Sequence, residues 1–300
     1  MESGAAMSPE LLRDFPHIAP RPAFPASHNQ ASLKQYLSEF KLDDAPPAEL
    51  ANYLNEDFLR FVHTLSLVPD GRTRLLEIGA NPYFTSILLK SFRQHELHCT
   101  NYFGIHGGGG QQTCKNEVTG ESFTFDYLNN NVDVEDIPFE GSFEIVLFCE
   151  VIEHLVGDPI GALRRIKDKL SPGGLLILTT PNVNRLENIA KMMSGQNMYD
   201  PISGYGVYGR HNREYNKHEL FLMLDHVGFD LEVMFSADVH ENLSNHYFPT
   251  HRIAKAILST PNRGHDLGQY LFVRARNTRP AKAGKPRWLY RSYPEAELCA

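Results

Sequence analysis

Hydrophobic residues are spaced differently in the two parts of the chain that meet near residue 70. Before that point, residues 48–67 carry apolar side chains at intervals of three and four, which predicts an amphipathic helix, and residues 31–40 fit a shorter one. Residues 1–30 are rich in proline and alanine and are typical of an irregular arm. A Pro-Asp-Gly sequence at 69–71 ends this helical part.

After that point, short apolar runs alternate with segments of helical periodicity. The runs that predict strands span 74–79, 97–103, 143–149, 175–180, 229–235 and 269–274, with a hairpin over 117–125. The segments that predict helices span 84–92, 159–170 and 216–228. The last of these has a capping-box pair, Asn216 with Glu219, at its start and Gly228 at its end. Strands that alternate with helices predict an α/β fold built on a parallel sheet.

Composition and charge narrow the class of protein. Of the 300 residues, 42% are hydrophobic and 22% charged, as in ordinary globular proteins, and a formal net charge of −7 argues against a dedicated nucleic-acid-binding protein. No apolar run approaches the roughly 18 residues that cross a bilayer, and no signal-peptide pattern opens the chain, so we expect a cytoplasmic protein. The absence of CxxC pairs predicts free, buried thiols. The cysteines are Cys99, Cys114, Cys149 and Cys299.

A glycine turn joins the first predicted strand of the sheet to the helix that follows it. The sequence LLEIGANPYFTS places Gly79 where ligands bind in open α/β sheets, beyond the carboxyl end of a strand and near a helix N-terminus. Only one glycine of a dinucleotide-binding GxGxxG motif is present, so NAD binding is disfavoured. An ordinary strand-to-helix turn is the alternative interpretation.

Two carboxylates and an imidazole follow the most apolar strand directly. If a helix begins there, the spacing of Glu150, Glu153 and His154 puts all three on one face, above the same crevice as the glycine turn. Because burying such groups is costly, we interpret them as a general base, a metal site, or both. The alternative is that the carboxylates cap the next helix and that His154 is a core histidine.

Three segments, taken in order, resemble class I S-adenosylmethionine-dependent methyltransferases, of the type 11 and type 23 kinds that include bacterial glycan-tailoring enzymes. They are LEIGANPY at 76–83, NVDVEDIPFEGSFEIVLFCEVIEHL at 131–155 and LRRIKDKLSPGGLLILTTPN at 163–182. The resemblance implies a doubly wound, Rossmann-like fold. Its sheet would have seven strands, mostly parallel with the last antiparallel, and helices on both faces. It also implies that S-adenosylmethionine lies over the strand ends.

The resemblance implies which residues line the cofactor site. These are Glu77, Gly79 and Asn81 on the methionine and ribose side, Asp133 and Val134 near the adenine, and Glu150 and Val151 at the sulfonium end. Asp133 is the candidate acceptor for the adenine amino group. The family usually carries an acidic residue at the end of the second strand, where this chain offers only Asn101 or Tyr102. An amide is a poorer acceptor for the ribose diol than a carboxylate, so what replaces the acid is an open question.

The methyl acceptor is predicted from the insertion after the fifth strand, which is rich in Asn, Tyr, Gly, Arg and His. We expect it to form the acceptor wall, with His211 and Arg213 as its functional side chains. Methylation of a hydroxyl requires removal of its proton, and His154, next to Glu153, is the candidate base. These features predict O-methylation of a sugar or glycan hydroxyl, with or without a carrier.

Two alternative functions stay open. The Glu150, Glu153, His154 and His211 set also resembles small-RNA 3′-end 2′-O-methyltransferases, in which an ExxEH motif and a distant histidine bind a divalent metal. The missing glycines and strand-two acid are also compatible with a catalytically degenerate binding subunit.

We divide the chain into an N-terminal arm and helical lid (1–70), a catalytic domain (71–276) and a basic C-terminal tail (277–300). Residues 274–291 hold seven basic side chains and no acid, which fits either a phosphate contact or a solvated tail. The Trp-Leu-Tyr sequence at 288–290 predicts that the tail docks on another surface. The glycine run at 106–110 is interpreted as a flexible surface loop.

Overall fold

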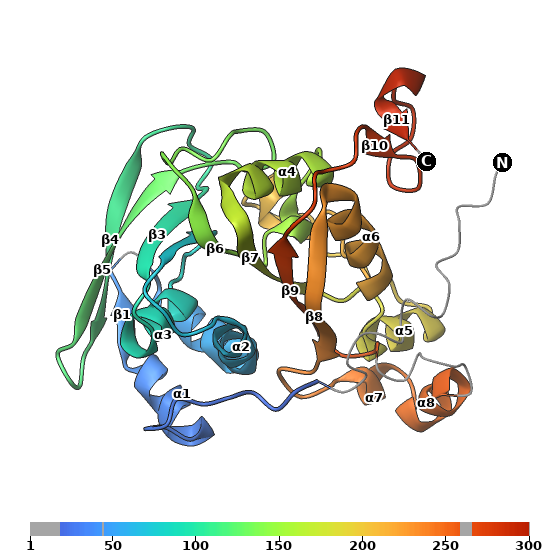
Figure 1. Cartoon of the computed structure of the whole chain (residues 1–300). Helices are drawn as coiled ribbons and strands as arrows, with labels where there is room; N and C mark the ends of the chain where they lie inside the picture. The colour runs from blue at the N-terminus through green and yellow to red at the C-terminus, as the bar shows by residue number, and fades with distance from the viewer. Residues whose placement is uncertain (1–18, 44, 259–265, 300) are drawn as a thin grey trace.

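The computed structural model, which describes residues 19–43, 45–258 and 266–299, folds around one large mixed sheet (Figure 1). Across the sheet the strands follow the order β1-β4-β5-β3-β2-β6-β7-β9-β8. The strands are β1 (Phe40–Leu42), β2 (Arg74–Ile78), β3 (Glu96–Asn101), β4 (Gly109–Asn116), β5 (Ser122–Asn129), β6 (Phe143–Cys149), β7 (Leu170–Pro181), β8 (Phe229–Ala237) and β9 (Tyr270–Asn277). The helices are α1 (Gln30–Ser38), α2 (Pro47–Leu67), α3 (Phe84–Phe92), α4 (Pro159–Lys169), α5 (Leu186–Met193), α6 (Lys217–Val227), α7 (Ser244–Tyr247) and α8 (Thr250–Leu258).

Seven of these strands form the predicted sheet. β5, β3, β2, β6 and β7 pair in parallel, and β9 runs antiparallel to both of its neighbours, β7 and β8. Adjacent residues on β2 point to opposite faces: Leu75 packs with α2 and α3, and Leu76 with α4 and α6. Figure 1 shows these helix pairs on opposite faces of the sheet. The doubly wound α/β class predicted from the sequence is therefore confirmed.

Two additional strands make the sheet larger than the seven strands expected. The hairpin predicted over 117–125 is in fact β4 paired with β5, and residues 109–110 of the glycine run belong to β4 rather than to a loop. The physical reason is close backbone approach. A Cβ on Gly109 would clash with the carbonyl oxygen of Tyr127 across the pair, so glycine is the residue that lets this strand form.

The segment between β6 and α4 also differs from the prediction. Instead of a helix beginning at Glu150, only a short 3-10 turn, η1 (Ile152–His154), forms there. α4 begins at Pro159 and is capped by Asp158, whose side chain accepts from Gly161 N–H at 2.9 Å. The alternative that the two glutamates cap this helix is therefore wrong. The capping predictions for α6 are confirmed, with Asn216 and Glu219 in a capping box and Gly228 at φ 88°.

After β9 the chain ends in two short paired strands, β10 (Lys285–Pro286) and β11 (Leu298–Cys299) (Figure 1). The segment before β10 is bonded to α4 and α6: Arg164 donates to the Gly284 carbonyl oxygen at 2.8 Å, and His226 Nε2 lies 3.1 Å from the same oxygen. The Tyr290 ring is buried, its hydroxyl bonds the Asp158 carboxylate, and Lys285 Nζ lies 2.6 Å from Asp158. Docking of the 288–290 segment is thus confirmed. All four cysteines are free thiols, as predicted; Cys99 and Cys114 are buried, whereas Cys149 and Cys299 are only half-buried. Within the described residues, no helix is both long enough and apolar enough to cross a bilayer.

Candidate active site

The glycine turn after β2 meets the acidic segment after β6. The two strands pair in parallel, with Ile78 opposite Phe148, so their carboxyl ends lie side by side. Gly79 has a φ of 74°, and a Cβ on it would come within 2.7 Å of Val151 Cγ2. Only glycine fits both the left-handed backbone and this contact. The crevice predicted over the strand ends is bounded by these two loops.

Two carboxylates predicted to face the cofactor are held at these strand ends. Glu77 accepts from Ser86 Oγ at 2.5 Å, and burial raises its pKa to about 7. Glu150 accepts from Thr179 Oγ1 at 2.7 Å; its removal from water raises its pKa, against the opposing effect of the Arg60 cation. Glu150 also has a φ of 54°, a left-handed conformation that is unusual for a side-chain-bearing residue and is concentrated at functional sites.

Arg60 of α2 is a site residue that the sequence analysis missed. Its side chain is only 4% exposed, and it lines a small cavity with Glu77, Gly79 and Cys149. The guanidinium lies 3.2 Å from the Asp57 carboxylate and donates to the Tyr53 hydroxyl at 2.5 Å. The signal was present in the sequence, because residues 53, 57, 60 and 64 recur at helical spacing and three of them are polar on a face that is buried.

Asn101, at the end of β3, stabilises the glycine turn through hydrogen bonds of its side-chain amide. Its Oδ1 accepts from the Asn81 backbone N–H at 2.9 Å, and its Nδ2 donates to the Tyr83 hydroxyl at 2.8 Å. Tyr83 in turn donates to Gln112 Oε1 of β4 at 2.8 Å. The buried amide therefore ties the turn to β3 and β4, and its predicted contact with the ribose stays a prediction.

Asp133 accepts hydrogen bonds from two directions. Its buried carboxylate accepts from the backbone N–H groups of residues 156, 157 and 158, at 2.9, 2.9 and 3.0 Å, which fixes the turn before α4. Its Oδ2 also accepts from the Tyr208 hydroxyl at 3.3 Å. The acceptor oxygen predicted to face the adenine amino group is therefore present, and Tyr208 uses it in this structure. The adjacent Val134 is 58% exposed.

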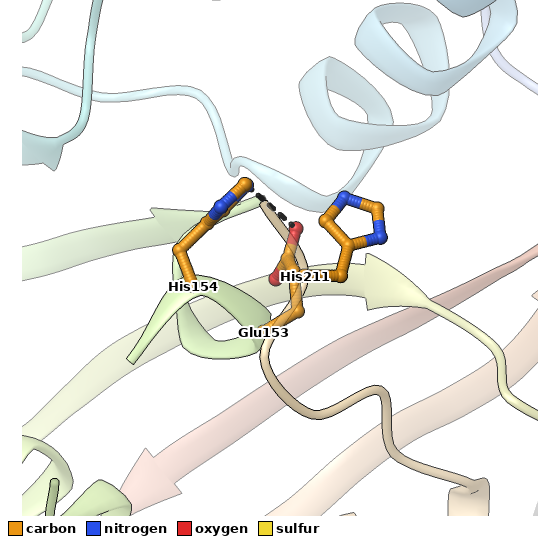
Figure 2. Close-up of side chains that lie close together, drawn as sticks. All are labelled: Glu153, His154 and His211. Carbon is orange, nitrogen blue, oxygen red and sulfur yellow. Dashed lines mark ion pairs between the residues drawn. The ribbon is translucent and has the colours of Figure 1, made fainter. Parts of the chain in front are cut away.

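Glu153, His154 and His211 converge as the sequence analysis proposed, and Figure 2 shows the three side chains together. Glu153 is fully buried; its Oε2 accepts from Thr180 Oγ1 at 2.9 Å, while its Oε1 has no hydrogen-bond partner among the described residues. That oxygen lies 3.8 Å from His154 Nε2, and the two imidazole centroids are 5.0 Å apart. Glu150 is not among the ligand atoms that cluster here.

The hydrogen bonds fix which nitrogen of each imidazole is available. His154 Nδ1 lies 3.0 Å from the Arg210 carbonyl oxygen, which can only accept, so Nδ1 carries the proton and Nε2 keeps its lone pair. Burial, and then the nearby His211 cation, lower the pKa of His154. Burial alone would also lower the pKa of His211, but its hydrogen bond to Glu214 and the charge of Glu153 raise it to about 9. The pair therefore holds one neutral and one cationic imidazole at neutral pH.

Glu214 is the anchor of His211. Its Oε1 lies 3.0 Å from His211 Nδ1, and its Oε2 accepts from Arg185 and Asn188 at 2.5 and 3.3 Å. Burial would raise the pKa of Glu214, but the hydrogen bonds from His211 and Arg185 lower it to about 2.

A pocket of about 480 Å³ opens beside His211. It is lined by Val183, Met198, Tyr199, Asp200, His211, Asn212, Arg213, Glu214, Asn216 and Glu219. His211 and Arg213 thus belong to one wall, and Arg213 is held by Glu219 at 2.6 Å. Most of the lining side chains are polar, and three are carboxylates.

The comparison with family models decides the class of protein. The model of a methyltransferase domain matches residues 50–232, which is more than half of the chain. The chain belongs to this methyltransferase family. It is an S-adenosylmethionine-dependent methyltransferase, as the sequence resemblance implied.

Individual relatives of this methyltransferase are more distant. The ubiquinone biosynthesis O-methyltransferase of Cereibacter sphaeroides is 42% identical over 62 residues, 20% of this chain and about a quarter (24%) of that protein. An S-adenosylmethionine-dependent methyltransferase from Mesorhizobium loti is 15% identical, with a TM-score of 0.44 over 74% of this chain and 97% of that one. The N-methyltransferase NodS from Bradyrhizobium japonicum, in complex with S-adenosylhomocysteine, is 12% identical, with a TM-score of 0.45 over 83% and 99% of the two chains.

The crevice of the methyltransferase suits a zwitterionic sulfonium in its chemistry. The Arg60 guanidinium complements a carboxylate, while the Glu77 and Glu150 carboxylates and the Tyr53 ring complement cationic groups. The Gly79 turn leaves the backbone accessible, because no Cβ can be placed there. The cavity lined by Tyr53, Arg60, Glu77 and Gly79 is small, about 20 Å³, so its walls must move apart for a ligand to enter.

Proposed function

We propose that this methyltransferase methylates a hydroxyl group of a sugar or glycan, with His154 as the proton acceptor. The observation that carries the proposal is the state of His154. Its Nδ1 proton is held by the Arg210 carbonyl oxygen, which leaves the lone pair on Nε2, and its ring stands against His211, which lines the polar pocket.

S-Adenosylmethionine, when bound, supplies an electrophilic methyl group on sulfur. His154 Nε2 would take the proton of the acceptor hydroxyl as the methyl group is transferred, so that the products would be a neutral methyl ether and S-adenosylhomocysteine. Burial, together with the nearby His211 cation, lowers the pKa of His154 and so keeps it unprotonated before the step, and Glu214 keeps His211 in place. Neither histidine needs to move during the transfer step itself, so the protein contributes mainly by positioning.

For the cofactor we propose the residues at the strand ends, Glu77, Gly79, Asn81 and Glu150, with Asp133 and Val134 at the adenine. To this set we add Arg60 as the partner of the cofactor carboxylate. Asp57 meets the guanidinium through a single 3.2 Å contact and Tyr53 through one hydrogen bond, which leaves further guanidinium N–H groups to bind a second anion.

The nature of the acceptor is inferred from the pocket. Hydroxyl-rich molecules are recognised by carboxylates and amides that accept several hydrogen bonds, and Asp200, Asn212 and Glu219 offer such groups. The matched O-methyltransferase relative supports oxygen as the methylated atom.

The test begins with calorimetric titration of S-adenosylhomocysteine, followed by a screen of free and carrier-linked sugars as methyl acceptors. His154→Ala should abolish turnover of any acceptor found while leaving S-adenosylhomocysteine affinity nearly unchanged. His98→Ala, on the strand β3 and away from the pocket, is the matched control. An undiminished rate in His154→Ala would remove this residue from the mechanism.

A second candidate function is metal-assisted 2′-O-methylation of an RNA end, which one observation favours. Glu153 Oε1 is buried and unpartnered, and both histidines have their Nδ1 atoms bonded to an oxygen, which is the arrangement that orients metal-ligating imidazoles. A divalent cation would be held by Glu153, His154 and His211 and would act as a Lewis acid on the acceptor hydroxyl. Such a cation and a proton cannot share His154 Nε2, so the two mechanisms exclude each other.

The two candidates are separated by titrating the purified protein with Mn²⁺ and by assaying methyl transfer with and without a chelator. Tight Mn²⁺ binding that Glu153→Gln abolishes, together with chelator-sensitive turnover of an RNA 3′ end, would replace the sugar proposal. Chelator-insensitive methylation of a sugar would exclude the metal-assisted one.

A further inference from the structure

Tyr208 lies against Asp133 and Tyr102, at the position where we place the adenine. It belongs to the short 3-10 helix η2 (Val207–Gly209), within the insertion that follows β7. Its hydroxyl donates to Asp133 Oδ2 at 3.3 Å, and its ring meets the Tyr102 ring edge-on, with centroids 5.3 Å apart and an interplanar angle of 84°. Asp133 follows β5 and Tyr102 follows β3, so this one side chain bridges the ends of two parallel strands.

These contacts are of the kind that an adenine makes. Adenine presents an aromatic ring and an exocyclic amino donor, and Tyr208 presents an aromatic ring and one hydroxyl donor. Asp133 Oδ2 already accepts the backbone N–H groups of residues 156 and 157 as well as the Tyr208 hydroxyl, so it cannot accept a fourth donor while Tyr208 is bound. Tyr208 and an adenine therefore compete for the same oxygen.

We propose that Tyr208 is an adenine mimic that closes the adenine subsite in the ligand-free protein and leaves when the cofactor binds. This inference rests on the proposed placement of the cofactor. The contact is weak enough to exchange: 3.3 Å is longer than the about 2.5–2.7 Å of a strong bond from a hydroxyl to a carboxylate. The side chain also keeps part of its surface in solvent.

Displacement of Tyr208 reaches the acceptor side of the site. Asn212 Nδ2 donates to the carbonyl oxygens of Val207 and His154, at 2.6 and 2.9 Å, and so ties η2 to the candidate base. The Arg210 carbonyl, two residues after Tyr208, fixes the His154 ring. If η2 moves when the cofactor binds, the Arg210 and Asn212 contacts that position His154 move with it. We therefore expect the cofactor to bind before the acceptor.

The test is calorimetric titration of S-adenosylhomocysteine into wild-type protein and two variants. A site that is open only part of the time has its apparent affinity reduced by the open fraction, so Tyr208→Ala should bind about fivefold more tightly than wild type. Tyr208→Phe keeps the ring and loses the donor, and it should gain less. 5′-Methylthioadenosine, which lacks the amino-acid part, should show the same gain. Tyr205→Ala is the control, since the Tyr205 side chain is in the same insertion and 88% exposed.

Each outcome decides the matter. Tighter binding by Tyr208→Ala with no change in Tyr205→Ala supports the mimic, including the case in which only the variant binds. Equal binding by all proteins overturns it and leaves the cofactor placement intact. Weaker binding by both Tyr208 variants, in proteins whose thermal unfolding matches wild type, also overturns it, because Tyr208 would then hold the cofactor. Absence of binding in every protein at millimolar ligand overturns the cofactor placement and the mimic together.

Discussion

The ion pair between His211 and Glu214 should make the stability of the protein depend on pH, and Glu214→Gln isolates that effect. The folded protein raises the pKa of His211 from 6.5 to about 9, a difference of about 2.5 that corresponds to about 3 kcal/mol at 1.36 kcal/mol per pKa unit. The His211 side chain is 27% exposed, and Glu153 and Asp200 share the effect, so we assign about 1–2 kcal/mol to Glu214.

The sign follows from linkage. Because the pKa of His211 is higher in the folded state than in the unfolded state, its contribution is fully present below pH 6.5 and is lost as the pH rises through about 9. Glu214 also bonds Arg185, and loss of that pair destabilises the variant equally at both ends of this range. Only the difference between the two pH values therefore reports on His211.

The assay is urea unfolding of wild type and Glu214→Gln at pH 6 and pH 9.5. We expect the variant to be destabilised by about 1–2 kcal/mol more at pH 6 than at pH 9.5. Histidine NMR titration should show the pKa of His211 falling toward 6.5 in the variant. Glu140→Gln, at an exposed carboxylate, is the control and should show neither change. An equal destabilisation at both pH values, with an unmoved His211 titration, would refute the reasoning.

Three further predictions concern the crevice and the C-terminal segment. Gly79→Ala should lose about 1–2 kcal/mol of unfolding free energy from its left-handed backbone, and more from the clash with Val151, measured by urea unfolding. Arg60→Met should weaken S-adenosylhomocysteine binding about tenfold in calorimetry, with the exposed Arg72→Met as control, because a charged hydrogen bond is lost. Tyr290→Phe should cost about 1–3 kcal/mol, since the Ile160 N–H loses its acceptor; an unchanged unfolding midpoint would mean that water replaces the hydroxyl.

The central strands and their helices could be predicted because burial on both faces leaves long apolar runs, and because caps such as Asn216 mark helix ends. β4 could not be predicted in the same way. Its inward-facing positions include Gln112 and Asn116, which are buried and satisfied by hydrogen bonds, so the strand carries no apolar alternation. Only pairing with β5, a tertiary property, makes it a strand.

The site shows the same division. Order along the chain was enough to bring Glu153, His154 and His211 together, because all three follow strands that end at one edge of the sheet or belong to the insertion above it. Spacing could not predict that Glu150 lies apart from this cluster, because the chain forms a 3-10 turn there in place of the expected helix. Tyr208 reaches its place from a remote segment, and its position depends on packing that no local pattern encodes. For Arg60, the polar residues at helical spacing on α2 marked the residue as unusual, but only tertiary packing shows which cavity it lines.

The three residues of β1 have a consequence for how the molecule behaves in solution. β1 lies on the outer side of β4, with Phe40 opposite Asn116 and Leu42 opposite Cys114, and Asn116 Nδ2 donates to Glu39. Without this cover, the outward-facing backbone groups of residues 114–116 would also lie unpaired at the rim of the sheet, where a strand from another molecule can add. A shortened protein that begins at α2 would therefore keep the catalytic groups and lose its protection against edge-to-edge association. The N-terminal segment thus helps to keep neighbouring copies of the enzyme apart.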